Sequence, residues 1–201
     1  MNGLNVVEDL VRAGRFGAAL TTLERLAVTP SIRLPVDVLH AELLERTGRH
    51  SQSKAIAERL LKNQNLTLGN RSSCESVLAL IEAERDGETG KALKHMQRAL
   101  LLAENSKDLR RICWCQLRLV ITLADISGHQ AMAPLLADAR TNAIKLGDST
   151  TSAALHIFLG EMEARRGLTR NAVRHSRLGQ NLLSHDTNVW LDGRGGCPTD
   201  C

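Results

Sequence analysis

Apolar residues recur at helical spacing along most of the chain, and short glycine-containing turns interrupt them at intervals. Around Gly48, for example, apolar residues occupy positions 38, 39, 41, 43 and 44 before the turn and positions 55, 56, 60 and 61 after it. Residues three or four apart lie on one face of an α-helix, so each run predicts one amphipathic helix. The pattern therefore predicts pairs of helices joined by short turns, and no strands.

These turns share a second feature, which shows that they repeat. A small residue follows each turn glycine by five positions; the glycines are Gly14, Gly48, Gly87, Gly128 and Gly167, and the small residues are Ala19, Ser53, Ala92, Ala133 and Ala172. The glycines are 34, 39, 41 and 39 residues apart. Glycine accepts the left-handed conformation in which one helix ends before the next begins. A small residue early in the second helix lets the two helix axes approach closely.

Five copies of this helix–turn–helix unit give the expected domain organisation. The units span about residues 2–29, 34–63, 71–104, 108–147 and 150–184, a partial helix continues to residue 192, and residues 193–201 form an irregular tail. One pair of helices cannot bury its own apolar stripe, so neighbouring units must stack on one another. We therefore expect an all-α solenoid of about ten helices.

The glycine and the small residue five positions later, repeated from Gly14 to Ala172, resemble the tetratricopeptide repeat (TPR) family. The first interval of 34 residues equals the period of that family, and the longer intervals resemble its bacterial relatives with longer helices. The resemblance implies a right-handed solenoid; HEAT-like helical repeats are the alternative. The last unit also resembles repeat segments attached to larger bacterial signalling and enhancer-binding regulators, on residues 155–168 and 189–191.

The resemblance implies a concave surface lined by the first helix of each unit. In the family, the residues six and three positions before each turn glycine face this groove; here they are Glu8, Val11, Glu42, Glu45, Ile81, Glu84, Thr122, Asp125, Glu161 and Ala164. Four arginines lie one position further on, namely Arg12, Arg46, Arg85 and Arg165. A row of carboxylates edged by guanidinium groups suits a peptide with basic and apolar side chains. The alternative is a solvated face with weak local ion pairs.

Composition supports a helical core and gives only a mild net charge. Hydrophobic residues make up 43% of the chain and aromatic residues 2%, so the core consists of Leu, Ala, Val and Ile. The formal net charge is +4 and most charges alternate in sign, whereas nucleic-acid-binding proteins concentrate basic residues. Arg170, Arg174 and Arg177 form a stripe without interleaved aromatic residues. We interpret it as a solvated helix face and expect no nucleic acid partner; contact with phosphate or an acidic partner is the alternative.

No motif for catalysis or for cofactor binding occurs in the sequence. It contains neither a phosphate-binding loop nor a dinucleotide fingerprint, and no two histidines have the i, i+4 spacing of a helical metal site. Cys113 and Cys115 point to different sides of one helix. Cys197 and Cys201, even with His185, supply too few ligands for a closed zinc site. We therefore expect no enzyme, no cofactor and no metal ion.

The compartment follows from features that are missing. No signal peptide is evident at the N-terminus, and the longest apolar run, residues 99–103, is far shorter than the roughly 20 residues of a membrane span. Five irregularly spaced cysteines do not indicate a disulfide framework. We expect a cytoplasmic protein without a membrane partner.

The function predicted from these observations is binding of a peptide or partner protein along the concave face. The alternative is a ligand- or peptide-sensing regulatory segment of a larger bacterial transcriptional or signalling protein. Trp190 lies where a sixth unit would begin, and the residues after Asp192 cannot supply the polar cap that terminal repeats need. Self-association through this uncapped end is therefore a further expectation.

Overall fold

The computed structural model describes residues 3–185 except residues 13–14, 28, 85–86, 125–128 and 148. The predictions for Trp190, for the tail at residues 193–201 and for Cys197 and Cys201 lie outside the described residues. Within the described part there are ten α-helices, one short 3-10 helix (η1, Pro30–Ile32) and no strand. The α-helices are α1 (Gly3–Arg12), α2 (Phe16–Glu24), α3 (Arg33–Arg46), α4 (His50–Leu61), α5 (Leu68–Glu84), α6 (Thr89–Ser106), α7 (Leu109–Ala124), α8 (His129–Leu146), α9 (Ser149–Arg165) and α10 (Thr169–His185). The predicted all-α class is confirmed.

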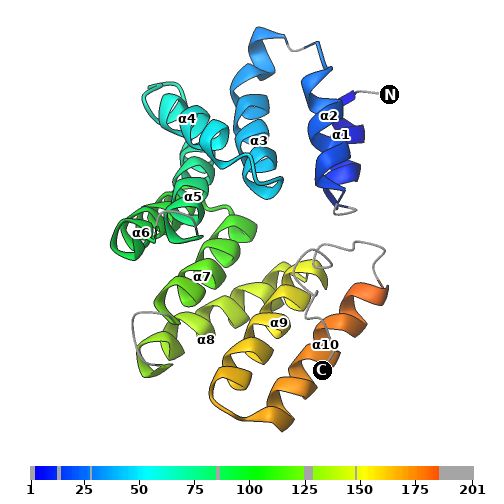
Figure 1. The fold of residues 1–201 in the computed structure, drawn as a ribbon, viewed down its shortest axis with the longest axis vertical. Coiled ribbons are helices and arrows are strands. Elements are labelled where there is room, and N and C mark those ends of the chain that lie inside the picture. Colours follow the sequence, from blue (N-terminus) through cyan, green and yellow to red (C-terminus); the bar gives the residue numbers. More distant parts are fainter. Residues whose placement is uncertain are drawn as a thin grey trace.

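Consecutive helices form hairpins that stack along a curved path (Figure 1). The path runs from α1 and α2 through α4, α5 and α6 and bends back to α9 and α10, so both ends of the stack lie on the same side in this view. From the second hairpin on, the first helix of each hairpin contacts the first helix of the next: α3 contacts α5, α5 contacts α7, and α7 contacts α9. The stack is the predicted solenoid.

The turns within the hairpins follow the predicted pattern wherever the structure describes them. Gly48, Gly87 and Gly167 have positive φ angles of 78°, 64° and 74°. The N–H group that follows the turn closes it by donating to a carbonyl of the preceding helix, as from Leu168 to Glu163 at 2.9 Å. Gly14 and Gly128 lie outside the described residues.

The small residues after the turns lie where two helices touch. Ala19, Ser53 and Ala92 have no exposed surface, and Ala172 is 8% exposed. Ser53 Oγ donates a hydrogen bond to the carbonyl of Ala41 at 2.7 Å, which joins α4 directly to α3. A larger side chain here would separate the helices, so the prediction of close approach is confirmed at these four positions; the side chain of Ala133 is not among those described.

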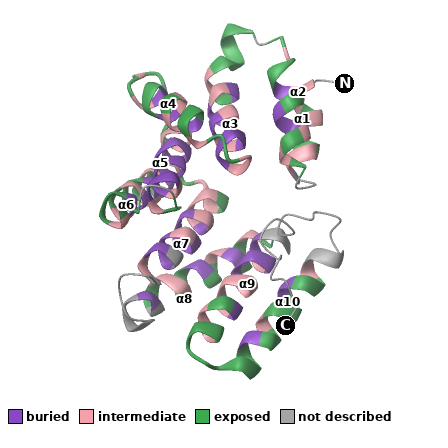
Figure 2. Cartoon of the chain, viewed as in Figure 1, coloured by how far each residue is buried: buried purple, intermediate pink, exposed green. Residues whose placement is uncertain are grey.

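The core consists of four apolar clusters arranged in series along the stack. Each cluster joins neighbouring hairpins; the first contains Val7, Leu20, Leu23, Leu43 and Leu44, the second Val38, Leu60, Val77, Leu78 and Ile81, the third Ala79, Met96, Ala99 and Leu119, and the fourth Leu117, Ala139, Ala143 and Leu155. Buried residues accordingly concentrate on α3, α5 and α7, while α4 and α10 are more exposed (Figure 2). Helix α5 is buried over most of its length because other helices pack around it.

Three cysteines are buried as small apolar residues. Cys113 belongs to the fourth cluster and Cys115 to the third, which confirms that they point to different sides of α7. Burial raises the pKa of the Cys74 thiol to about 12, with smaller contributions from Glu42 and Glu75. Burial also raises the pKa of Cys115. A raised pKa keeps these thiols protonated and therefore unreactive.

Arg71 fixes the junction between the second and third hairpins. Its guanidinium group donates to the carbonyl oxygens of Leu61, Asn63 and Leu66 at 3.0, 2.6 and 3.1 Å. The last carbonyls of a helix have no partner within the helix, and the end of α4 is satisfied in this way by a side chain of α5.

Helices α9 and α10 pack closely because each presents a glycine to the other. A Cβ atom at Gly160 would lie 3.1 Å from the Ala172 carbonyl oxygen, and one at Gly179 would lie 3.1 Å from the Ala153 carbonyl oxygen. Next to this contact, His156 and His175 stack with ring centroids 5.3 Å apart and their Nδ1 atoms 3.1 Å apart. Burial, followed by His175 and Arg140, lowers the pKa of His156.

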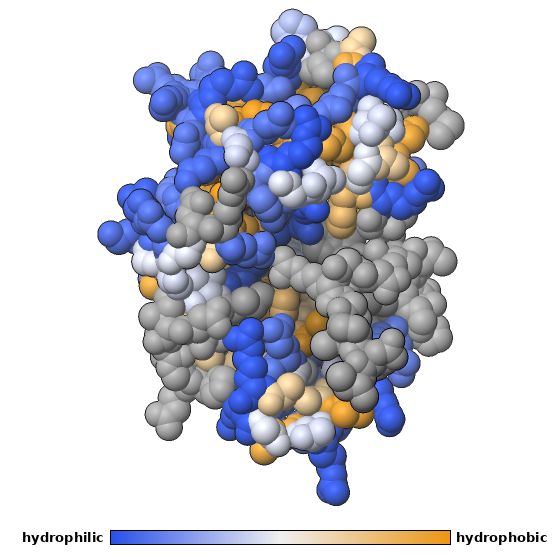
Figure 3. Space-filling view, in the orientation of Figure 1, coloured by the Kyte–Doolittle hydropathy of each residue, from blue (hydrophilic) through white to orange (hydrophobic). Residues whose placement is uncertain are grey.

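Hydrophilic side chains dominate the described part of the face seen in Figure 3, and apolar side chains show among them over the first hairpins and at the end formed by α9 and α10. None of the helices in the described part of the chain is long and apolar enough to cross a membrane.

We predict that Gly160→Ala and Gly179→Ala each lower the free energy of unfolding by about 1–3 kcal/mol, because the added methyl group meets backbone of the facing helix. Alanine otherwise favours a helix by about 1 kcal/mol over glycine. Gly90→Ala in α6 is the matched control, since no atom lies within 4 Å of its added Cβ. Urea unfolding measures all three variants. Equal stability of Gly179→Ala and Gly90→Ala would contradict the close packing.

We predict that acid destabilises the α9–α10 hairpin through His156. Its pKa in the folded protein lies below the ordinary value of 6.5, so the unfolded chain binds this proton more readily. The stabilising effect of the neutral ring is fully present above the ordinary value and is lost as the pH falls below it. Thermal melting from about pH 7 to about pH 5 should show a flatter dependence of Tm on pH for His156→Asn than for the unmodified chain. Identical slopes would show that His156 does not titrate in this way.

Candidate functional site

A cavity of about 250 Å³ opens on the side of the stack where the first helices of four hairpins meet. Its walls come from α1, α3, α5 and α7 and from the turn before α7; the lining is Val11, Leu39, Glu42, Leu43, Glu45, Arg46, Ser72, Ser73, Ser76, Val77, Asp108, Arg110, Arg111, Trp114, Cys115 and Arg118. We call this the concave groove. First helices line it, as the resemblance to TPR proteins implied.

Four of the residues predicted to lie along the groove line this cavity. Glu42, Glu45 and Arg46 line it from α3, and Val11 lines it from α1. The Arg46 guanidinium lies over the Phe16 ring, 5.0 Å from its centroid, which directs this side chain toward α2.

Other predicted residues lie elsewhere, and for Ile81 and Thr122 the prediction that they face the groove is wrong. Ile81 is 2% exposed and packs in the second apolar cluster, so it cannot face a groove. Thr122 is also buried, and its hydroxyl donates to the Arg118 carbonyl at 3.0 Å. The reason is the orientation of α5: Ser76 faces the groove, and Ile81, five residues later and therefore about 140° further around the helix, packs in the second apolar cluster.

The remaining predicted residues fall outside the cavity lining or outside what the structure describes. Glu8, Glu84 and Glu161 are exposed but do not line the cavity, and Glu161 accepts a hydrogen bond from Arg165 at 2.8 Å. The side chain of Arg12 and the residues Arg85 and Asp125 are not described. A binding role for any of these residues stays a prediction.

Sequence reasoning missed the groove residues of α5 and α7. Ser73 and Ser76 face the groove from α5, and Arg111, Trp114 and Arg118 face it from α7. A usable signal was present: three serines within five residues, Ser72 to Ser76, directly precede the apolar run of residues 77–81 in the same helix. Ser72 serves the fold instead, because its Oγ donates to the Ala99 carbonyl of α6 at 2.7 Å and lies 3.7 Å from Cys115 Sγ.

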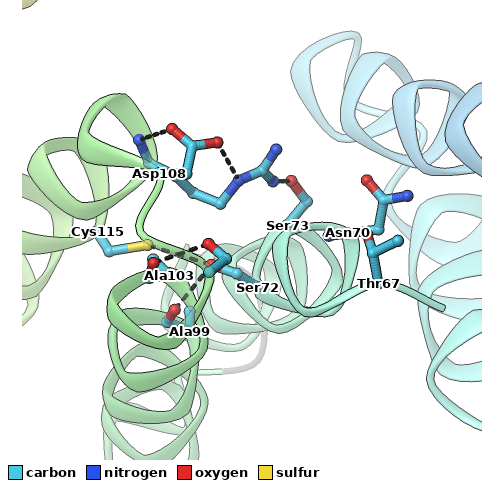
Figure 4. Close-up of polar contacts among 10 residues, drawn as sticks. Thr67, Asn70, Ser72, Ser73, Ala99, Ala103, Asp108 and Cys115 are labelled. Carbon is cyan, nitrogen blue, oxygen red and sulfur yellow. Dashed lines mark hydrogen bonds and ion pairs between the residues drawn. The ribbon is translucent and has the colours of Figure 1, made fainter.

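Asp108, which Figure 4 shows near Ser73, holds Arg111, and both residues line the groove. The Asp108 carboxylate accepts from the backbone N–H of Arg111 at 3.1 Å, which caps the start of α7, and from Arg111 Nε at 3.3 Å. Arg111 Nη1 then donates to Ser73 Oγ across the groove. About two turns further along α7, Arg118 Nη1 donates to Ser76 Oγ at 2.6 Å.

The two sides of the groove differ in charge. Glu42 and Glu45 lie on the α3 side with Arg46, whereas the α7 side contributes three arginines and one carboxylate, Asp108. Leu39 of α3, Val77 of α5 and Trp114 of α7 add apolar side chains to the lining, and Trp114 also packs on the fourth cluster. The groove can therefore contact basic, apolar and acidic groups at different points.

A buried ionic cluster lies on another side of α5. His95 contacts Glu75 through Nδ1 and lies 3.6 Å from Glu82 through Nε2, while Lys54 Nζ lies 4.0 Å from Glu82. These contacts join α4, α5 and α6. In the described part of the chain, no group of three or more His, Cys, Asp or Glu side chains is arranged to hold a metal ion.

The outer face of α10 forms a second, shallower surface. It carries the predicted arginine stripe, and a hollow of about 680 Å³ is lined by Thr169, Arg170, Val173, Arg174, Arg177, Leu178 and Asn181. Val173 and Leu178 are exposed, and they are the apolar residues that a further repeat would cover. Self-association through this end stays a prediction.

Comparison with known proteins identifies the fold. No protein-family model and no curated protein matches the chain. Among solved structures, aspartyl phosphate phosphatase F from Bacillus subtilis superposes with a TM-score of 0.65 at 14% identity, over 87% of this chain and 46% of that one. BtubC from P. vanneervenii gives a TM-score of 0.61 at 15% identity, over 85% of this chain and 71% of that one.

A third structure is a Podospora anserina protein described as a kinesin light chain of nearly identical TPR-like repeats, with a TM-score of 0.57 at 15% identity over 91% of this chain and 93% of that one. At these identities the likeness shows the fold alone. The chain is an all-α, TPR-like repeat solenoid, as its repeat pattern predicted, and it spans about half the length of the Bacillus subtilis phosphatase.

We predict that the two kinds of serine on α5 respond differently to alanine substitution. Ser72→Ala removes a buried hydrogen bond between α5 and α6 and should lower the free energy of unfolding by about 1 kcal/mol. Ser76→Ala removes the acceptor of one arginine N–H but also a buried hydroxyl hydrogen that has no acceptor, so the two effects offset and the free energy of unfolding should change by less than about 0.5 kcal/mol. Urea unfolding compares the variants. An equal loss for both would show that Ser76 also serves the fold.

Proposed function

We propose that this chain is a non-catalytic interaction module whose concave groove binds an extended or helical segment of another polypeptide. The observation that carries the proposal is the groove itself, which four successive first helices line with charged and apolar side chains. TPR-like solenoids generally act as protein-interaction modules, and repeat solenoids commonly use this concave surface for recognition.

The groove offers a distinct contact to each kind of side chain. Glu42 and Glu45 would accept charge-assisted hydrogen bonds from a lysine or arginine of the partner. Leu39, Val77 and Trp114 would contact apolar side chains, and a large aromatic residue is typical of the centre of a binding site. A partner segment that carries both basic and apolar residues fits these groups.

A second candidate is a regulatory segment of a larger bacterial protein, in which the groove senses a ligand or peptide. The observation that favours it is the match to the Bacillus subtilis phosphatase, which this chain covers over only 46% of its length. The two candidates share the groove and differ in whether binding changes an attached effector.

The test uses peptides selected on the purified chain from a random library displayed on phage. The chain has two tryptophans, and Trp190→Phe removes the one outside the groove. The fluorescence of Trp114, which lines the groove, then reports its occupation. We predict that Glu42→Lys weakens binding of the selected peptides by about tenfold or more, because it replaces attraction by repulsion in a partly dry site.

Glu58→Lys is the matched control. It makes the same charge change on α4, where Glu58 is exposed and does not line the groove. Selected peptides should bind this variant as they bind the unmodified chain. Failure to select any peptide would overturn the proposed function, and equal binding to both variants would overturn its basic-residue contact.

A further inference from the structure

The α7 side of the concave groove holds two arginine–serine pairs that no basic or apolar partner residue would use. Arg111 donates to Ser73, and Arg118 donates to Ser76. The serines are three residues apart on α5, a rise of about 4.5 Å, whereas the arginines are seven apart on α7, a rise of about 10.5 Å. The two guanidinium groups must therefore converge on adjacent points of α5.

The hydrogen-bond donors of these pairs are not all satisfied. A guanidinium group only donates, so each serine oxygen is the acceptor and its hydroxyl hydrogen needs an acceptor of its own. In the described part of the chain, neither Ser73 nor Ser76 makes a second hydrogen bond. Both serines are only 6% exposed, so bulk water has little access to them. A buried donor without an acceptor costs free energy, and these hydroxyls are therefore suited to a ligand acceptor.

The charge at this place is also unbalanced. Arg118 makes no ion pair with any carboxylate among the described residues. Arg111 forms an ion pair with Asp108, whose Oδ2 lies 3.3 Å from Arg111 Nε. Arg111 Nη2 makes no hydrogen bond within the described part of the chain. Donors and positive charge thus exceed acceptors and negative charge on the α7 side.

The surroundings favour a carboxylate over a phosphate as the missing acceptor. Asp108, Glu42 and Glu45 line the same cavity and would repel a dianion more strongly than a single negative charge. A carboxylate has two oxygens that match paired guanidinium donors. The cavity of about 250 Å³ lies below the roughly 300–1,000 Å³ typical of sites for whole small molecules, so it suits side chains of a longer ligand that extends beyond it.

We infer that Ser73, Ser76, Arg111 and Arg118 form a subsite for the side-chain carboxylate of an aspartate or glutamate in the bound polypeptide. The inference rests on the proposed function and extends it. The partner segment then carries a basic residue against Glu42 and Glu45 and an acidic residue against Arg118, which fixes its direction across the groove from α3 to α7.

The first experiment needs no selected peptide. The 15N-labelled chain is titrated with N-acetyl-glutamate α-amide, with N-acetyl-glutamine α-amide as the neutral control and with inorganic phosphate. The arginine Nε–Hε resonances are followed, and Arg111→Lys and Arg118→Lys identify the two signals. The Arg118 signal should shift in a saturable way with the glutamate compound and not with the glutamine compound. No shift, or a shift with phosphate alone, would overturn the carboxylate subsite.

The second experiment is a double-mutant cycle with the phage-selected peptides. Arg118→Met should weaken binding of a peptide that contains glutamate by about tenfold and binding of its Glu→Gln version by less than about twofold. Arg98→Met, an exposed position on α6, is the matched control, and melting temperatures show that each variant is folded.

Equal weakening of both peptides by Arg118→Met, or selected peptides without any acidic residue, would overturn the subsite. Dependence on Glu42 would persist in that case, and the proposed function would stand. Loss of the Glu42 dependence with the Arg118 coupling intact would instead overturn the basic-residue contact of the proposed function.

Discussion

The structure depends on one constraint: no helix pair of this chain buries its own apolar face. Each of the four apolar clusters joins neighbouring hairpins, so every hairpin is stabilised by the next one along the stack. With very few aromatic residues available, the helices must lie close together to exclude water. Ala19, Ser53 and Ala92 permit this after the turns, and glycines permit it between α9 and α10.

Helix α5 shows how the same constraint creates the groove. It contacts α3, α4, α6 and α7, so most of its surface is covered, yet its faces differ in chemistry. Its apolar residues enter two clusters, Glu75 and Glu82 meet His95 on one side, and Ser73 and Ser76 remain on the side where α3 and α7 diverge. Polar residues in this buried helix are thus concentrated where partners from other helices or from a ligand can reach them.

The fold could be predicted from the sequence because its signals are local and repeated. Gly48, Gly87 and Gly167 have the expected backbone conformation, and the residue five positions later is buried wherever its side chain is described. The groove was predicted only in part, because one register was applied to every unit. That register places Glu42 and Glu45 of α3 in the lining of the groove, but α5 presents another face to it, and Ile81 packs in the core.

The remaining site residues depend on contacts between distant positions. Arg111 and Ser73 are 38 residues apart and Arg118 and Ser76 are 42 apart, so no local spacing links them. The close contacts at Gly160 and Gly179 also involve distant positions. In the sequence alone, these glycines stand out only as poor helix formers. Only the packing of one helix on another brings such pairs together.

The serial core has a consequence for how the chain responds to a bound segment. In a stack whose hairpins are stabilised only by their neighbours, one hairpin can unfold without directly destabilising the hairpin after next. The cooperativity of unfolding therefore decreases with distance along the stack. Helices α3 and α7 do not pack directly on each other in the described part of the chain; both pack on α5. A segment spanning the groove would join them and add to the coupling between next-nearest hairpins. Occupation would then lengthen the cooperative unit, so that three hairpins resist unfolding together.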